Sequence, residues 1–315
     1  MRICIYGAGA MGFSLGIYLN KAGVSSDLVT RNAAHVDAMK ERGYSALLPE
    51  DMAGQYDVIF LSTKQRENRS IAEFLLPYFK SDGALVTVQN GLPEEGLAEV
   101  FGADRVYGCT LGWGAELVRA GDVRITSDSQ GRQHLAIGAY GKGERLEEIA
   151  ALLRNAFEVT VGNLMEIRFA KLVVNASFST LSVISGLTFG ELSKKHKKLV
   201  LLLVREVISV ARAYGCKKLV QNGHDILKLF SSPFATLILP VAMKKHRDIR
   251  SGMLRDINAG RRCDVDFVAG ACVNAGKKKN VSTPYLERAI ALVHDIENGL
   301  AEIAPESLKL LSERY

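Results

Sequence analysis

Apolar runs and amphipathic segments alternate along the first half of the chain. Short apolar runs predict five buried strands, at Ile3–Tyr6, Asp27–Thr30, Tyr56–Ser62, Ala84–Val88 and Glu158–Val161. Helical spacing of apolar residues follows the first strand over Phe13–Ala22 and precedes the last over Arg145–Ala156. Strands that alternate with helices are typical of a doubly wound α/β sheet.

Two segments depart from this alternation. Between Val106 and Gly138, short alternating runs are separated by turn-forming pairs, so we expect an antiparallel addition at the edge of the sheet. After Gly162-Asn163 the strand patterns nearly vanish and helical periodicity continues to the last residue, in a chain of 315 residues. That length is about twice the usual size of one domain, so we predict an α/β domain over residues 1–162 and an all-helical domain over residues 163–315.

A glycine-rich turn, Gly7-Ala8-Gly9-Ala10-Met11-Gly12, joins the first predicted strand to the first predicted helix. In this context Gly7 permits the tight turn, Gly9 lets a pyrophosphate approach backbone N–H groups, and Gly12 allows close packing of helix and strand. The helix N-terminus, with Ala10 and Met11, then presents donors and a partial positive charge. The turn predicts a dinucleotide site; a glycine turn without a ligand is the alternative.

Polar residues follow the other predicted strands of this domain. Thr30-Arg31 stands where a site for NAD usually has Asp or Glu, and a guanidinium suits a 2′-phosphate, so we expect NADP(H). A solvated arginine is the alternative. Lys64 and Asn90 follow the next two strands, whose carboxyl ends face the ligand in open α/β sheets. Ordinary loop residues would fit both positions equally well.

The predicted helix Leu164–Ile184 is apolar on most faces, which indicates burial. Lys171, Asn175, Ser179 and Ser182 nevertheless recur at spacings of 4, 4 and 3, as one polar stripe. A lysine on a buried helix is costly unless a partner or ligand meets it. We interpret the stripe as the lining of a cleft, with a structural hydrogen-bonded seam as the alternative.

Composition excludes several classes of protein. With 48% hydrophobic and 23% charged residues the chain is an ordinary globular one. Its five cysteines form no CxxC pair and its six histidines form no i, i+4 pair, so we expect no disulfide framework, metal site or histidine triad. This cysteine usage fits a reducing compartment, so we expect a cytoplasmic protein.

The charge of +6 predicts neither a nucleic-acid nor a membrane partner. Three short basic runs, Lys194–Lys198, Lys244–Arg247 and Lys277–Lys279, adjoin amphipathic helices and fit a solvated surface. The most lipid-like stretch, Leu227–Met243, is broken by prolines and Lys228 and is too short for a span. The expected partner is a small molecule, and the apolar helical half leaves a homodimer open.

Taken together, these segments resemble the ketopantoate reductase (2-dehydropantoate 2-reductase) family over nearly the whole chain. The matching motifs are the glycine turn, Thr30-Arg31, Ser62-Thr63-Lys64, Gln89-Asn90-Gly91, Lys171-Leu172-Val173-Val174-Asn175, the predicted turn Gly190-Glu191-Leu192, and Met253-Leu254-x-Asp256-Ile257 with Gly260-Arg261. The resemblance implies a Rossmann-type NADP-binding domain and a helical substrate and catalytic domain. It also implies NADPH-dependent reduction of a 2-oxo acid to a 2-hydroxy acid, first of all ketopantoate to pantoate in pantothenate (coenzyme A) biosynthesis.

The resemblance also implies roles for individual residues. Lys171 would polarise the ketone and act as general acid, and Asp264 would be the acidic residue at the substrate. The substrate would be bound by four polar residues, Asn90, Asn175, Ser179 and Ser251. Arg31 and Lys64, with Asn90 and the glycine turn, would hold the cofactor.

Four departures from the family pattern concern the substrate. Ser179 and Phe189 stand where the family usually has Asn, Gly252 replaces a serine beside Ser251, and Asp264 replaces a Glu. These changes favour, as an alternative, a reductase for a bulkier or aromatic 2-oxo acid. A catalytically silent NADP-binding regulatory protein is a third hypothesis, against which the retained Lys171 argues.

Overall fold

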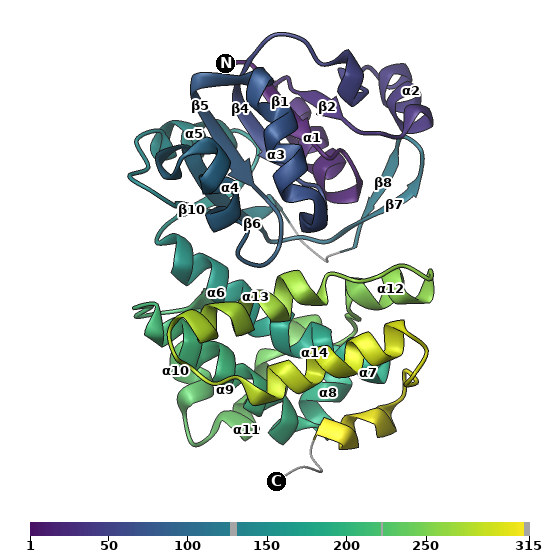
Figure 1. Ribbon diagram of the computed structural model, residues 1–315, viewed down its shortest axis with the longest axis vertical. Coiled ribbons are helices and arrows are strands. Elements are labelled where there is room, and N and C mark those ends of the chain that lie inside the picture. The colour runs from purple at the N-terminus through teal and green to yellow at the C-terminus, as the bar shows by residue number, and fades with distance from the viewer. Residues whose placement is uncertain (127–130, 222, 312–315) are drawn as a thin grey trace. The chain divides into compact units, whose positions relative to one another are not determined.

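The computed structural model describes residues 1–126, 131–221 and 223–311. The chain divides into two compact units, Met1–Leu164 and Met165–Tyr315, so the division falls two residues after the position named above. The first unit is an α/β domain with a parallel-rich sheet and the second is built of helices (Figure 1).

An eight-stranded sheet in the order β10-β9-β6-β5-β4-β1-β2-β3 forms the first unit. Its strands, as described, are β1 (Ile3–Tyr6), β2 (Asp27–Val29), β3 (Ala46–Leu47), β4 (Tyr56–Leu61), β5 (Phe79–Thr87), β6 (Val106–Leu111), β9 (His134–Ala139) and β10 (Glu158–Val161). The six neighbouring strands β3, β2, β1, β4, β5 and β6 all run parallel. This is the doubly wound order of Rossmann-type domains. The predicted fold class is therefore confirmed.

The predicted antiparallel addition is smaller than expected. In the eight-stranded sheet β6 runs parallel to β5, and β9 pairs antiparallel with β6. Strands β7 (Ala115–Arg119) and β8 (Asp122–Ile125) form a separate two-stranded sheet. The prediction was wrong for the direction of β6 and for the place of β7 and β8, which pair antiparallel with each other outside the eight-stranded sheet. Apolar alternation reports burial, whereas the direction and place of a strand depend on the connections.

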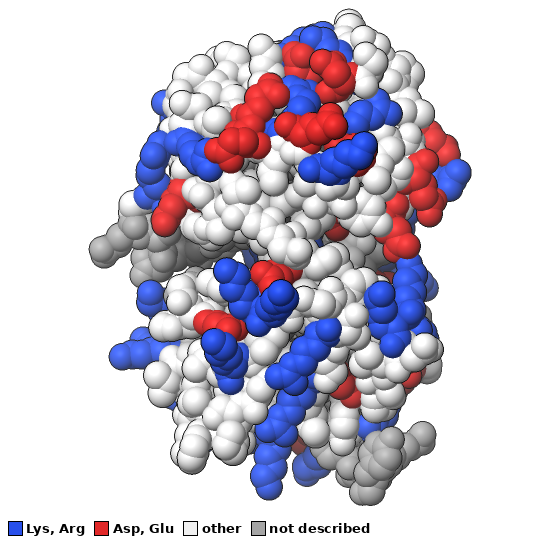
Figure 2. Space-filling model, turned by 90° about the vertical axis from the view of Figure 1, so that its left-hand side faces the viewer, with Lys and Arg blue, Asp and Glu red and all other residues white. Residues whose placement is uncertain are grey.

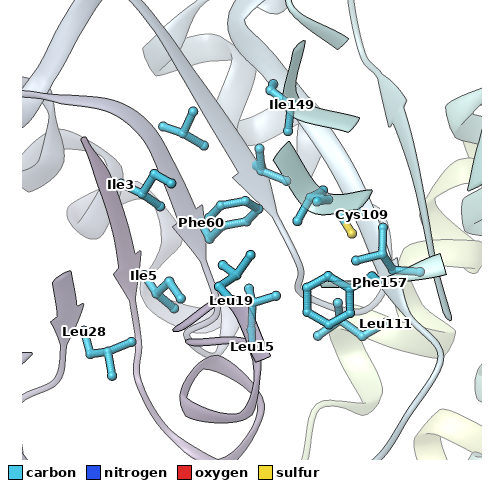
Figure 3. Packing of buried hydrophobic residues seen from close by; sticks show 14 of the residues in the cluster. Ile3, Ile5, Leu15, Leu19, Leu28, Phe60, Cys109, Leu111, Ile149 and Phe157 are labelled. Carbon is cyan, nitrogen blue, oxygen red and sulfur yellow. The ribbon is translucent and has the colours of Figure 1, made fainter. Parts of the chain in front are cut away.

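Helices cover both faces of the sheet because successive strand residues point to opposite sides. Ile3 and Ile5 belong to one buried cluster, shown in Figure 3, and Cys4 and Tyr6 belong to the other. The first cluster packs α1 (Ala10–Lys21), α2 (Ala33–Glu41) and α5 (Leu146–Arg154), and the second packs α3 (Asn68–Leu75) and α4 (Glu94–Phe101). Each large apolar side chain buried in this way contributes roughly 1.5–3 kcal/mol.

Over the described residues 165–221 and 223–311 the second unit contains nine α-helices, of which the first begins at Leu164, the last residue of the first unit. They are α6 (Leu164–Val174), α7 (Thr180–Ser185), α8 (Phe189–Lys195), α9 (Lys197–Ala213), α10 (Ile226–Ser231), α11 (Ala235–Ala242), α12 (Gly252–Asn258), α13 (Val265–Lys278) and α14 (Pro284–Glu297). A short hairpin, β11 (Val220–Gln221) and β12 (His224–Asp225), interrupts them. The predicted single helix over 164–184 is divided by a π-helical turn, Asn175–Ser179.

The segment Leu164–Ser185 is also long and apolar enough to cross a membrane, by length and composition alone. Of its most apolar window, 72% is buried inside the unit. A core helix of a globular domain passes the same test, so the segment is weak evidence for a membrane span.

Candidate cofactor and substrate sites

The three glycines of the turn after β1 have different surroundings. Gly7 has a φ of +96°, and a Cβ there would lie 2.7 Å from the Thr63 backbone nitrogen. A Cβ on Gly12 would lie 2.3 Å from the Gly7 carbonyl oxygen, whereas a Cβ on Gly9 would meet no described atom within 4 Å. Gly7 and Gly12 therefore permit backbone packing, and Gly9 leaves space for a ligand beside the backbone.

Helix α1 begins inside this turn, at Ala10, three residues before the predicted start. Gly9 is its N-cap, and among the described residues no side chain caps it; the first turn also lacks an acidic residue. Ala10 and Met11 are half-buried there, and Gly12 is buried. Since the first N–H groups of a helix have no partner within the helix, this end suits a pyrophosphate.

The loops after β4 and β5 meet beside the glycine turn. The sheet order reverses between β1 and β4, where doubly wound sheets bind their ligands. Lys64 is exposed at the N-cap of a short 3₁₀ turn, Gln65–Glu67, and exposed Asn90 accepts a hydrogen bond from Gln65 through its backbone oxygen. The first unit thus brings the glycine turn, Lys64 and Asn90 to one edge of the sheet.

Gln89 connects these loops, although sequence reasoning singled out only its neighbour Asn90. Its amide nitrogen donates to the Thr63 carbonyl oxygen at 2.9 Å and to Asn68 Oδ1 at 2.7 Å. The Thr87 hydroxyl donates to Gln89 Oε1 at 3.1 Å. A buried amide with this many bonds fixes the two strand ends relative to each other. The signal in the sequence was the Gln-Asn-Gly turn itself.

His35 is a second residue that sequence reasoning missed. The Gly121 N–H donates to its Nδ1 at 2.8 Å, so the neutral ring carries its proton on Nε2, which lies 2.9 Å from the Ala8 carbonyl oxygen. Burial lowers the pKa of His35, which keeps the ring neutral. His35 thereby ties the glycine turn to the β7–β8 hairpin. A lone histidine in an amphipathic segment gives no sequence signal of this role.

Arg31 lies two residues beyond β2 and is exposed. Its Nη1 lies 3.3 Å from Oε2 of Glu67, on the turn that follows β4. The guanidinium is therefore available at the carboxyl edge of the sheet, but it has an acidic neighbour that the sequence did not indicate.

Three predicted residues of the second unit share one partly accessible face. Lys171, Asn175 and Ser179 are half-buried at the end of α6 and in the π-turn, with buried apolar residues between them. π-turns within helices are frequent at functional sites. Ser182 does not belong to this stripe: it is fully buried and donates to the Leu187 carbonyl oxygen at 2.7 Å. The prediction for Ser182 was wrong, because the stripe ends where α7 enters the core.

Ser251 and Asp264 occupy helix N-caps. Ser251 is 2% exposed, its hydroxyl accepts from the Met253 N–H at 3.2 Å, and its own N–H donates to Ser182 Oγ. Its hydroxyl thus caps α12. Asp264 is the half-buried N-cap residue of α13, and its side chain makes no capping bond to the described start of that helix.

Phe189, one of the four departures, lies in the core of the helical unit. It is 5% exposed and its ring lies 5.4 Å from that of Phe178. Thr188 and Glu191 form a capping box around it, so Gly190-Glu191-Leu192 begin α8 and the predicted turn there was wrong.

Charge is unevenly divided between the units. Residues 1–164 contain 16 Lys and Arg against 20 Asp and Glu, and residues 165–315 contain 24 against 14. Figure 2 shows one face, where Lys and Arg predominate over the helical unit and most Asp and Glu lie on the α/β unit. A basic unit attracts small anions. In the described ranges, no three His, Cys, Asp or Glu side chains gather as metal ligands.

The family model described as "Ketopantoate reductase PanE/ApbA" matches residues 3–141, and its C-terminal counterpart matches residues 163–297. The chain belongs to the ketopantoate reductase family. A 2-dehydropantoate 2-reductase of Pyrococcus horikoshii is 28% identical over 303 residues, 90% of this chain and 93% of that protein. The family consists of oxidoreductases that use a nicotinamide dinucleotide.

Two solved structures have the same fold as this chain. A ternary structure of D-mandelate dehydrogenase with NADH and anilino(oxo)acetate has a TM-score of 0.80 at 24% identity, covering 95% of this chain and 99% of that one. A dimeric ketopantoate reductase from Staphylococcus aureus has a TM-score of 0.74 at 16% identity, covering 96% and 100%.

Proposed function

We propose that this protein is an NADPH-dependent reductase of 2-oxo acids, with ketopantoate as its first substrate and pantoate as the product. The observation that carries the proposal is that this member of the ketopantoate reductase family has both a candidate cofactor site and a candidate substrate site. One is the glycine turn with open space at Gly9, and the other is the half-buried face of Lys171 and Asn175. We place the reaction in the cytoplasm, in pantothenate biosynthesis.

The glycine turn, Lys64 and Arg31 would hold the cofactor. The first turn of α1 would bind the pyrophosphate, and Arg31 would contact the 2′-phosphate. When bound, the reduced nicotinamide supplies the hydride. Gly7, Gly12, His35 and Gln89 support this proposal because they fix the backbone around the turn without occupying the space beside Gly9.

Lys171 would act on the substrate ketone. Its ammonium donates a hydrogen bond to the carbonyl oxygen and transfers a proton to that oxygen as negative charge develops, so the alcohol leaves neutral. A cation stabilises the developing alkoxide more than the ketone, which is the condition for catalysis. Asn175, one helical turn away, would orient the same oxygen or the carboxylate, and Ser179 and Asp264 are further polar groups of this unit that would bind the substrate. The basic helical unit would attract the anionic acid.

A bulkier or aromatic 2-oxo acid is the second candidate. The D-mandelate dehydrogenase with this fold was solved with anilino(oxo)acetate, an oxo acid that carries an aromatic ring. A catalytically silent NADP-binding regulatory protein is the third hypothesis, and a measurement of turnover with 2-oxo acids tests it. A homodimer is proposed because a relative with this fold is dimeric.

Replacing Lys171 with alanine tests the proposal. We expect kcat for 2-oxo acids to fall by about 10²–10⁴, the usual contribution of a general acid, while the Kd for NADPH changes by less than about twofold. Lys198→Ala, an exposed lysine on α9, is the matched control and should leave kcat unchanged. Turnover of Lys171→Ala near the wild-type rate would refute the assignment.

A further inference from the structure

An ion pair spans the carboxyl end of β1. Arg31 follows β2 and Glu67 follows β4, and both strands flank β1 in the sheet. Arg31 Nη1 and Glu67 Oε2 are 3.3 Å apart, with side chains 78% and 51% exposed. The pair therefore lies over the strand end from which the glycine turn begins, and solvent reaches both groups.

Both charges act on this end of the sheet. Burial raises the pKa of Tyr6, the last residue of β1; the charge of Arg31 lowers it and that of Glu67 raises it further. The two side chains thus impose opposite potentials on the end of β1, next to the end of β2 where a doubly wound domain contacts the adenosine ribose.

The two cofactors respond to this pair in opposite ways. A 2′-phosphate brings negative charge to Arg31 and places it beside the Glu67 carboxylate, where like charges repel. A ribose with a free 2′-hydroxyl can instead donate a hydrogen bond to a carboxylate, as in sites that prefer NAD. Arg31 alone would favour NADPH. Because Arg31 and Glu67 together have little net charge, the pair attracts the 2′-phosphate of NADPH less strongly.

We propose that Glu67 is a specificity-determining residue that limits the preference for NADPH over NADH. This inference rests on the proposed function, because it assumes that Arg31 meets the 2′-phosphate. It deepens that function by dividing cofactor choice between two residues: Arg31 attracts the phosphate, and Glu67 weakens that attraction and offers an acceptor to the hydroxyl.

Direct binding of NADPH and NADH to the whole protein tests this, without substrate or turnover. We would titrate cofactor fluorescence with wild type, Glu67→Gln, Arg31→Ala and the double variant. Because an exposed charge pair is weak and screened, Glu67→Gln should tighten NADPH by about three- to tenfold, leave NADH unchanged or weaker, and lose this effect in high salt. In the Arg31→Ala background most of the gain should disappear.

Glu73→Gln is the matched control, since Glu73 forms a similar exposed pair with Arg69, at 3.1 Å on α3. Its NADPH/NADH ratio should equal that of wild type. If Arg31→Ala weakens NADPH but Glu67→Gln leaves the ratio unchanged, or Glu73→Gln shifts it equally, only the role of Glu67 is refuted. If Arg31→Ala leaves NADPH binding unchanged, the NADP assignment and this inference are both wrong.

Discussion

Replacing Gly9 with alanine should weaken cofactor binding, whereas replacing Gly12 with alanine should lower the free energy of unfolding. A Cβ on Gly12 would stand 2.3 Å from the Gly7 carbonyl oxygen, closer than real Cβ contacts allow, so α1 must move away from the turn. Overpacking of this kind costs about 1–3 kcal/mol of unfolding free energy. Gly9 has φ −74° and ψ −158°, an extended conformation open to alanine, and the methyl group meets no described atom within 4 Å. Gly9→Ala should therefore cost about 1 kcal/mol or less.

For cofactor binding, Gly9→Ala should be the more damaging of the two substitutions. The Gly9 methyl would occupy the space beside the first turn of α1, so at least one hydrogen bond to the pyrophosphate is lost. A hydrogen bond to a charged group contributes about 1.5–3 kcal/mol, which corresponds to roughly 10- to 150-fold weaker NADPH binding. Urea unfolding and NADPH titration of both variants check this. A Gly9→Ala protein that binds NADPH like wild type, or a Gly12→Ala protein of wild-type stability, would refute this account of the turn.

Two further predictions concern buried titratable groups. Since burial lowers the pKa of His35 below 6.5, the unfolded chain gains its proton first as pH falls; the unfolding free energy should then decrease below about pH 6.5, by up to ~1.4 kcal/mol per unit. His35→Gln should lose that part of the slope in urea unfolding at several pH values, and equal slopes would contradict it. All five cysteines are buried, and burial raises the pKa of Cys216 to about 11 and of Cys263 to about 12. A disulfide reagent should label them only after unfolding; rapid labelling of the native protein would be the contrary result.

Much of the fold could be predicted because it depends on local patterns. The apolar runs at β1 and β10 have the bounds expected from the sequence, and the glycine turn marked the start of α1. Strand β5 begins at Phe79, five residues before the predicted start, because Lys80, Ser81 and Asp82 are polar and partly exposed. Where a strand extends beyond the core, its residues are polar, and an apolar pattern cannot predict that part of the strand.

The candidate sites depend partly on contacts that no local pattern contains. Lys171 and Asn175 could be found because they are one helical turn apart. The bonds of His35 to Ala8 and Gly121, and the pairing of Arg31 with Glu67, join residues distant in the chain. Ser182 was assigned to the polar stripe because a uniform helical period cannot predict where α7 becomes buried.

We propose that this protein reduces a 2-oxo acid at the expense of NADPH. The most direct measurement is NADPH oxidation by the purified protein, with ketopantoate and a panel of aliphatic and aromatic 2-oxo acids. We predict turnover with ketopantoate, or with a bulkier member of the panel if the substrate residues have changed its selectivity. Tight NADPH binding without oxidation by any 2-oxo acid would contradict a reductase activity and favour a regulatory protein.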